Sequence, residues 1–319
     1  MSQTLIRTEG LQKYFKVPNG WLHAVDGVDL EIRRGETLGV VGESGCGKST
    51  LGRAILRLHE PTGGKVFFED ANILEYSASK MDKLRPNMQI IFQDPYSSLN
   101  PRMTVQELIA EPLHINKVYR SKRQVYQRVA ELMEIVGLAE RLTAAYPHEL
   151  DGGRRQRIGV ARALALNPKF IVCDEPVSAL DVSIQAQIIN LLMDLQDEFG
   201  LTYLFITHDL SVVKHISNDI MVMYMGVCVE HASSDELFHN PTHPYTKALL
   251  SAIPIPDIDR RLKPVDIIKG EVTNPVNPKP GCRFAPRCPH CSDKCLQSAP
   301  ELRSVGEGHL TACIKAGSI

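Results

Sequence analysis

The sequence has no long apolar run and almost no net charge, and these two absences exclude several classes of protein. No stretch of about 18 consecutive apolar residues occurs, so no segment is expected to span a bilayer. The N-terminal residues Met1 to Glu9 lack the apolar core of a signal peptide, which predicts a cytosolic protein unless a partner tethers it to a membrane. The net charge of −1 gives no basic field that would attract nucleic acid or an anionic lipid surface.

The sequence also lacks internal repeats and low-complexity tracts, and cysteine is scarce outside one segment. Cys46, Cys173 and Cys228 are scattered along the chain. The other five cysteines crowd into its C-terminal end, as Cys282, Cys288, Cys291, Cys295 and Cys313. In a reducing cytosol, such a cluster indicates metal binding more than disulfide bonds.

Hydrophobic periodicity predicts an α/β protein with a helical insertion. Residues 29–32 alternate polar and apolar, and the chain then turns at Arg33-Arg34-Gly35. Apolar runs at 170–173 and 203–206 indicate buried strands, and apolar residues at helical spacing lie between them. Strands that alternate with helices predict a mostly parallel sheet covered on both faces.

The same patterns suggest where the chain divides. From about residue 97 to 165 the pattern is helical, and one amphipathic face carries Val125, Val129, Leu132, Met133 and Val136. After Ile253 the prolines Pro254, Pro256, Pro264, Pro275, Pro278 and Pro280 predict a stiff, irregular linker. We therefore predict a main domain over 1–253, with a helical subdomain at about 97–165, and a Pro/Cys-rich extension over 254–319.

The strongest motif is a phosphate-binding loop of the pattern G-x-x-x-x-G-K-[ST]. It lies between the apolar run 38–41 and a helical stretch at 49–58, the context that this loop requires. Glycines let successive backbone N–H groups surround a phosphate, and the helix N-terminus adds its positive dipole end. Lys48 is predicted to reach the β- and γ-phosphates, and Ser49 to hold Mg²⁺. The predicted nucleotide contacts here are Gly42, Glu43, Ser44, Gly45, Cys46, Gly47, Lys48, Ser49 and Thr50.

A second motif is an apolar strand, 170–173, that ends in the acidic pair Asp174-Glu175. Asp174 is predicted to orient Mg²⁺, and Glu175 to polarise the attacking water as a general base. Between the two motifs, Asp151-Gly152-Gly153-Arg154 opens a helix-like stretch whose N–H groups face an anion.

Together these motifs resemble the ATP-binding subunits of ABC transporters, and the resemblance covers residues 3–253 in the family's order. It implies a RecA-like P-loop core with an antiparallel β subdomain, a helical insertion and, in this chain, a Cys-rich C-terminal tail. It also implies that Gln93 belongs to the Q-loop that senses Mg²⁺ and the membrane subunits, Asp181 to the D-loop, and that His208 contacts the γ-phosphate. Phe15, in preference to Tyr14, matches the aromatic residue that stacks on adenine.

The sequence departs from this family at its signature, where the usual Leu-Ser-Gly-Gly-Gln has Asp151 for Ser and Arg154 for Gln. In the family, this signature completes the ATP site of a partner ATPase, and its serine donates to the γ-phosphate. An ionised aspartate cannot donate and adds like charge. The departure predicts one half of a heterodimer with a second, homologous ATPase.

The C-terminal end resembles the oligopeptide/dipeptide/nickel importer group, in the segment Pro241 to Leu250 and in the pattern Cys282-Arg283-Phe284-Ala285-Pro286-Arg287-Cys288. This resemblance implies a [4Fe–4S] cluster on Cys282, Cys288, Cys295 and Cys313, with Cys291 spare. Spacing alone also allows a zinc site made from Cys288, Cys291 and Cys295 with His290 and His309, or free thiols. Because the phosphate loop lies elsewhere along the chain, the tail is expected to be structural, with no part in hydrolysis.

The predicted function is ATP hydrolysis that drives import of di- and oligopeptides. ATP and Mg²⁺ are the expected ligands, and the expected partners are two transmembrane permease subunits, the second ATPase and, indirectly, an extracytoplasmic solute-binding protein. The protein would be peripheral, on the cytoplasmic face of the plasma membrane. One alternative is import of nickel or another small solute by the same machinery. Another is a soluble ABC ATPase that acts on nucleic acid or ribosomes, which the neutral charge disfavours.

Overall fold

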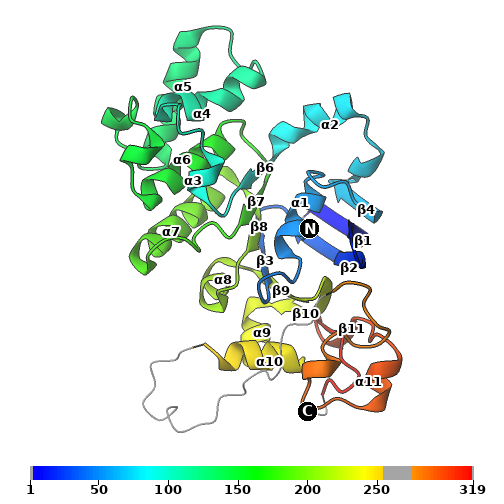
Figure 1. Ribbon diagram of the computed structural model, residues 1–319. Helices are drawn as coiled ribbons and strands as arrows, with labels where there is room; N and C mark the ends of the chain where they lie inside the picture. Colours follow the sequence, from blue (N-terminus) through cyan, green and yellow to red (C-terminus); the bar gives the residue numbers. More distant parts are fainter. Residues whose placement is uncertain (1–2, 254–274, 318–319) are drawn as a thin grey trace, which may run out of the picture. The chain divides into compact units, whose positions relative to one another are not determined.

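The computed structural model describes residues 3–253 and 275–317, in two compact units (Figure 1). The helical unit comprises Met1–Leu5, Arg33–Glu36 and Glu75–Ile206. The phosphate-loop unit comprises Ile6–Ile32, Thr37–Leu74 and Thr207–Ile319. The first part of the predicted linker, with Pro254, Pro256 and Pro264, lies outside the described residues. The predicted domain boundary at residue 253 therefore stays a prediction.

The helical unit is built on three parallel strands in the order β6-β7-β8. Its strands are β6 (Met88–Ile91), β7 (Phe170–Asp174) and β8 (Thr202–Ile206). Ile91 pairs with Cys173, and Asp174 pairs with Ile206, so the carboxyl ends of the three strands align. Every residue of β7 and β8 is buried, as expected for parallel strands covered on both faces. The predicted strands at 170–173 and 203–206 are confirmed.

Helices make up the rest of the helical unit (Figure 1). They are α2 (Ala78–Leu84), α3 (Pro95–Ser98), α4 (Val105–Ile115), α5 (Lys122–Ile135), α6 (Gly152–Leu164) and α7 (Val182–Phe199). Short 3-10 turns lie at Arg85–Asn87, Glu140–Leu142 and Pro147–Glu149. Thr104 and Glu107 form a capping box that starts α4, and Ser121 and Gln124 form another that starts α5. The predicted apolar face of α5 is confirmed, because Val125, Val129, Leu132 and Met133 are buried.

The phosphate-loop unit contains a four-stranded antiparallel sheet in the order β2-β1-β4-β5. Its strands are β1 (Thr4–Val17), β2 (Gly20–Arg33), β4 (Gly63–Phe68) and β5 (Ala71–Asn72), and the 3-10 turn Ile73–Glu75 follows. The expected antiparallel β subdomain is therefore present. The turn predicted at Arg33-Arg34-Gly35 follows the end of β2.

A second group of strands in this unit joins the phosphate loop to the C-terminal tail. It consists of β3 (Thr37–Val41), β9 (Asp219–Tyr224), β10 (Val227–Ser233), β12 (His309–Thr311) and β11 (Arg303–Gly306), which neighbour one another in that order. β3 and β9 are parallel, with Val41 opposite Val222. The other pairs are antiparallel, and Glu230 of β10 faces Thr311 of β12. The tail thus extends the sheet of the ATP-binding core.

The helices of this unit are α1 (Lys48–Ile55), α8 (Leu210–Ile216), α9 (Ser234–His239), α10 (Pro244–Ser251) and α11 (Asp293–Gln297), with a 3-10 turn at Ala285–Arg287. An aromatic cluster joins the tail to the core: the Tyr224 ring centroid lies 4.8 Å from that of Tyr245 and 5.3 Å from that of Phe284. All three side chains are almost fully buried, which makes this cluster a large apolar contribution to the stability of the tail. Among the described helices, none is long and apolar enough to cross a membrane.

Candidate ATP site and cysteine-lined tail pocket

The phosphate loop connects β3 to α1, as the sequence predicts. Gly42 has φ 150° and Gly47 has φ 106°, conformations that residues with side chains rarely adopt. A Cβ atom at Gly47 would lie 1.9 Å from the carbonyl oxygen of Ala24, and one at Gly42 would lie 2.2 Å from that of Met223. Both glycines are therefore required by close backbone contacts as well as by backbone conformation.

Lys48 begins α1 and is only 4% exposed. Its Nζ donates to the carbonyl oxygens of Gly42, at 2.7 Å, and of Glu43, at 3.0 Å. These hydrogen bonds hold the Lys48 side chain at the phosphate loop, where its amine can bind an anionic ligand. Ser49 and Thr50 follow in the first turn of the helix.

His208 lies on the same unit, in the turn before α8. Thr207 is fixed to β3 by a 3.2 Å hydrogen bond from its N–H to Val40 O, and its hydroxyl accepts from Asp209 N–H at 3.0 Å. Asp209 then caps α8 by accepting from Ser211 N–H at 2.8 Å. This turn presents the exposed His208 on a rigid support.

Tyr14 and Phe15 lie on β1 in different surroundings. The Tyr14 ring stacks on His23 at 3.9 Å between centroids, and its hydroxyl donates to Asp26. The Phe15 ring makes a T-shaped contact with the His59 ring, with 5.6 Å between the ring centroids. The Lys13 Nζ lies 4.8 Å from the centroid of the Phe15 ring. Tyr14 is thus held by its neighbours, which favours the prediction of Phe15 as the adenine-stacking residue without testing it.

In the helical unit, the acidic pair lies at the end of β7 as predicted. Asp174 is 1% exposed and Glu175 is 9% exposed. Glu175 has φ 48°, uncommon for a residue with a side chain, and its N–H donates to Ile206 O at 2.9 Å. Gln93 Nε2 donates to Glu175 Oε2 at 3.0 Å. The hydrogen bond from Gln93 and the pairing with β8 hold the Glu175 carboxylate at the end of β7.

The signature segment forms the start of α6, and Asp151 is its N-cap. One Asp151 carboxylate oxygen accepts from Arg154 N–H at 2.8 Å, and the other pairs with Arg154 Nη1 at 3.2 Å. Both side chains are about half exposed. Gly153 packs closely on α7, because a Cβ there would lie 2.6 Å from Ile184 Cγ2, and Asp181 caps α7 through Ile184 N–H at 3.0 Å. The two departures from the family pattern thus interact with each other.

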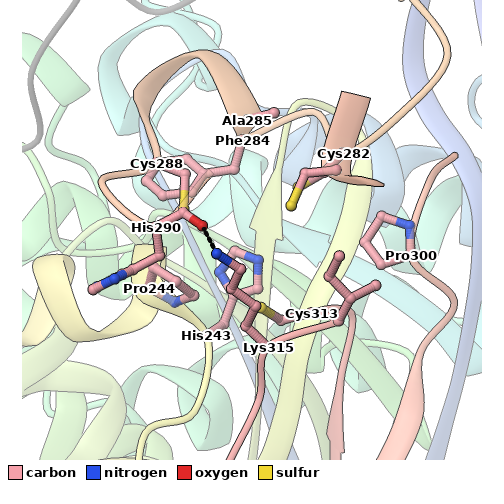
Figure 2. A pocket seen from close by; sticks show the side chains of 12 residues that line it. His243, Pro244, Cys282, Phe284, Ala285, Cys288, His290, Pro300, Cys313 and Lys315 are labelled. Carbon is pink, nitrogen blue, oxygen red and sulfur yellow. Dashed lines mark hydrogen bonds between the residues drawn. The ribbon is translucent and has the colours of Figure 1, made fainter. Parts of the chain in front are cut away.

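The tail cysteines predicted as cluster ligands converge on one pocket (Figure 2). Cys282, Cys288, Cys295 and Cys313 all line it, together with His243 and His290. The remaining tail cysteine, Cys291, is exposed. Figure 2 shows Lys315 donating across the pocket to His290 O, at 2.6 Å. The four cysteines, up to 31 positions apart in the chain, are therefore brought to one small cavity of about 20 Å³.

The thiols of this pocket influence one another. Burial is the largest cause that raises the pKa of Cys282 to about 11, and the nearby Cys295, Cys288 and Cys313 contribute to that rise. Burial also raises the pKa of Cys288, again with neighbouring cysteines adding to the effect. Within residues 3–253 and 275–317, no three His, Cys, Asp or Glu side chains are grouped closely enough to hold a single metal ion. His309, named in the zinc alternative, is instead bound to Glu230 at 2.8 Å and Glu236 at 3.3 Å.

Sequence reasoning missed two contacts that the phosphate loop makes with the C-terminal region, one from the tail and one from α10. Arg287 makes a double hydrogen bond to Glu43, with Nη1 at 2.7 Å and Nη2 at 3.0 Å. The Tyr245 hydroxyl accepts from Glu43 N–H at 2.8 Å. We expected a purely structural tail because the tail and the phosphate loop are far apart in the sequence. In the folded chain, however, Arg287 of the tail contacts Glu43 of the loop. The only sequence signal was the arginine inside the Cys-x-Phe-x-x-Arg-Cys pattern, and it indicated no partner.

Two protein-family models and several curated proteins resemble this chain. The family described as ABC transporter matches residues 25–178, and the one described as oligopeptide/dipeptide transporter, C-terminal region, matches 229–295. The putative oligopeptide transport ATP-binding protein YkfD of Bacillus subtilis is 55% identical over 291 residues, 91% of this chain and 88% of its own. The oligopeptide transport ATP-binding protein OppF of Salmonella typhimurium is 53% identical over 96% of this chain and 92% of its own.

Solved structures confirm the fold. The dimeric ATP-binding cassette MJ0796, in a post-hydrolysis state bound to ADP and Pi, superposes with a TM-score of 0.66 at 30% identity, over 72% of this chain and 99% of its own. CbiO1 of Clostridium perfringens, part of the ABC transporter complex cbiONQ, also gives 0.66, at 28% identity over 75% of this chain and 92% of its own. The predicted RecA-like P-loop fold is confirmed. The chain therefore belongs to the ATP-binding subunits of ABC transporters, in the group that carries the oligopeptide/dipeptide transporter C-terminal region.

Proposed function

We propose that this chain hydrolyses ATP to drive import of oligopeptides through a membrane complex. The observation that carries ATP hydrolysis is the phosphate loop with its buried Lys48. Relatives named as oligopeptide transport ATP-binding proteins, about half identical over nearly the whole chain, support peptides as the transported class.

Different residues of the chain bind the phosphates, the Mg²⁺ ion and the adenine of ATP. Lys48 binds the β- and γ-phosphates, and the loop amides of residues 42–50 surround them. Ser49, Asp174 and Gln93 hold Mg²⁺, which supplies charge neutralisation at the phosphates when it is bound. Phe15 stacks on the adenine, and Asp181 belongs to the loop that contacts the second ATPase.

Glu175 is the general base. It takes the proton of the attacking water at its carboxylate, while Gln93 orients that carboxylate through the 3.0 Å hydrogen bond. His208, exposed on its turn, contacts the γ-phosphate and stabilises the charge that builds there.

The tail pocket holds a [4Fe–4S] cluster on Cys282, Cys288, Cys295 and Cys313. Four cysteines that line one pocket are the donor set of such a cluster. When bound, the cluster cross-links the tail.

The second ATPase is a homologue with an intact signature. Both oxygens of the Asp151 carboxylate already interact with Arg154, one by capping α6 and the other by an ion pair. Asp151 is therefore poorly suited to bind a partner's γ-phosphate. Gly152, Gly153 and Arg154 still complete that partner's site. Lys48 and Glu175 are the residues of this chain that hydrolysis requires.

The complex contains two permease subunits and receives peptides from an extracytoplasmic binding protein, and this chain docks peripherally on the cytoplasmic face. Reconstitution tests the proposal. Proteoliposomes with this chain, its partner ATPase, both permeases and the binding protein should take up labelled oligopeptide only with ATP. ATP-dependent uptake of nickel without peptide uptake would overturn the peptide assignment, and ATPase activity stimulated by DNA or ribosomes instead would overturn the transport role.

A further inference from the structure

Glu43, the second residue of the phosphate loop, is held at three points. Its N–H donates to the Tyr245 hydroxyl at 2.8 Å, its carbonyl accepts from Lys48 Nζ at 3.0 Å, and its carboxylate receives both terminal nitrogens of Arg287. Two of the three partners come from the C-terminal region, outside the residues matched by the ABC transporter family. The tail therefore holds the loop residue to which the catalytic lysine also binds.

The Arg287–Glu43 pair is geometrically well defined. The side chain of Arg287 is 6% exposed and that of Glu43 is 23% exposed, so solvent screens the pair only in part. The two parallel hydrogen bonds match the planar guanidinium to the carboxylate, an arrangement that a lysine cannot make. The Nε of Arg287 is buried without a hydrogen-bond partner among the described residues, which costs free energy. A residue chosen for packing alone would avoid this cost, so packing does not account for the arginine.

The chemical problem at this position is the charge of Glu43. A phosphate loop attracts an anion through its amides and its lysine, whereas a carboxylate in the same loop repels that anion. An unpaired Glu43 carboxylate would also compete with ATP for Lys48, which already binds the backbone of Glu43. The guanidinium of Arg287, the residue before Cys288 in the tail, neutralises the negative charge of the Glu43 carboxylate.

We infer that Arg287 is a positioning residue for ATP binding: it neutralises and holds Glu43, so that the phosphate loop presents amides and Lys48 to the nucleotide. This inference depends on the proposed role of the phosphate loop. It makes the C-terminal region part of the ATP-binding apparatus.

The test uses the purified full chain and displacement of a fluorescent ATP analogue. Arg287→Gln, which keeps the length and loses the charge, should raise the Kd for ATP about tenfold, equal to 1.4 kcal/mol. Glu43→Gln removes the carboxylate charge and keeps the loop backbone, so its own Kd is the reference for the double variant. The double variant Arg287→Gln/Glu43→Gln should recover the affinity lost in Arg287→Gln.

That recovery separates charge neutralisation from simple support. If Arg287 only anchors the tail, Glu43→Gln will not rescue Arg287→Gln, and the inference fails. In the assembled transporter, Arg287→Gln should raise KM for ATP and leave kcat nearly unchanged, whereas a disordered site would lower kcat. The matched control is Arg303→Ala, a tail arginine that donates to Cys313 O at 2.8 Å and should leave ATP affinity intact.

Two further outcomes are informative. If Arg287→Gln does not fold, Arg287→Lys replaces it, and the single-point contact of lysine should raise the Kd about threefold; an unchanged Kd overturns the inference. If Lys48→Ala leaves ATP affinity unchanged, the phosphate-loop role fails as well. If Lys48→Ala loses binding but Arg287→Gln does not, the loop role stands and only the inference is overturned.

Discussion

Gln93 donates a 3.0 Å hydrogen bond to the carboxylate of Glu175, although 82 residues separate them. The bond joins the end of β6 to the end of β7, where adjacent parallel strands bring their carboxyl ends together. It orients the carboxylate of the proposed general base. Gln93 thereby gains a role in positioning, in addition to the contacts with Mg²⁺ and membrane subunits that the family resemblance implies.

Glu175→Gln should abolish hydrolysis at this subunit's site and leave ATP binding intact. Glutamine keeps an oxygen that can accept from Gln93 but cannot take a proton, so the rate should fall by about 10²–10⁴. Steady-state ATPase of the purified transporter measures the loss, and nucleotide affinity is the control. Wild-type turnover in this variant would show that Glu175 is not the base.

Lys48→Ala should weaken nucleotide binding itself. The buried ammonium is the cation closest to the loop carbonyls, and its loss removes the charge that attracts the phosphates. Equilibrium binding of ATP to the full chain should show at least a tenfold higher Kd, about 1.4 kcal/mol. The exposed Lys294 of the tail provides the matched control, and Lys294→Ala should bind ATP normally.

The tail should contain iron. Anaerobically purified protein should be brown and hold about four irons per chain. Cys288→Ser should lose the colour, whereas Cys291→Ser, a change at the exposed cysteine, should keep it. Colourless protein with one zinc per chain would support the zinc alternative instead.

Catalytic-glutamate variants on each ATPase subunit should have unequal effects. Glu175→Gln on this chain should remove nearly all transport-coupled ATPase, and the matching change on the partner should remove little. The reason is that Asp151 completes the partner's site with a carboxylate already committed to α6 and Arg154. Equal losses from the two variants, or full activity of this chain as a homodimer, would contradict the asymmetry.

Stability should fall as the pH drops from about 6.5 to 4. Burial lowers the pKa of His243 to about 4, and its Nδ1 accepts from Tyr245 N–H at 3.1 Å, so the folded state holds this ring neutral. Between these pH values the unfolded chain binds the proton more tightly, so the stabilisation is complete above 6.5 and is lost as the pH falls toward 4. The loss is on the order of 3 kcal/mol.

Denaturant unfolding at several pH values measures this effect. Glu230, whose carboxylate accepts from His243 N–H at 3.1 Å, opposes the shift but does not reverse it. His243→Asn keeps a side-chain acceptor for the cap of α10 and should flatten the profile. His114→Asn, at an exposed position, should not. A profile unchanged by His243→Asn would contradict the assignment.

The sequence by itself determined the fold class and most of the candidate site, because those features are local. The phosphate loop needs glycines and a lysine at fixed spacing, the acidic pair ends an apolar strand, and α5 shows its buried face through spacings of three and four. A family resemblance added the roles of Gln93 and His208. These residues could be found without knowing where any other part of the chain lies.

Only the tertiary structure decided which distant residues meet. Arg287 pairs with Glu43 across 244 positions, and four tail cysteines share one pocket while Cys291 stays outside. No periodicity encodes such contacts, because they depend on β12 joining the edge of β10 and on Tyr224, Tyr245 and Phe284 packing together. Burial of that aromatic cluster places the tail beside the phosphate loop, and the pairing of Arg287 with Glu43 then follows from charge and proximity.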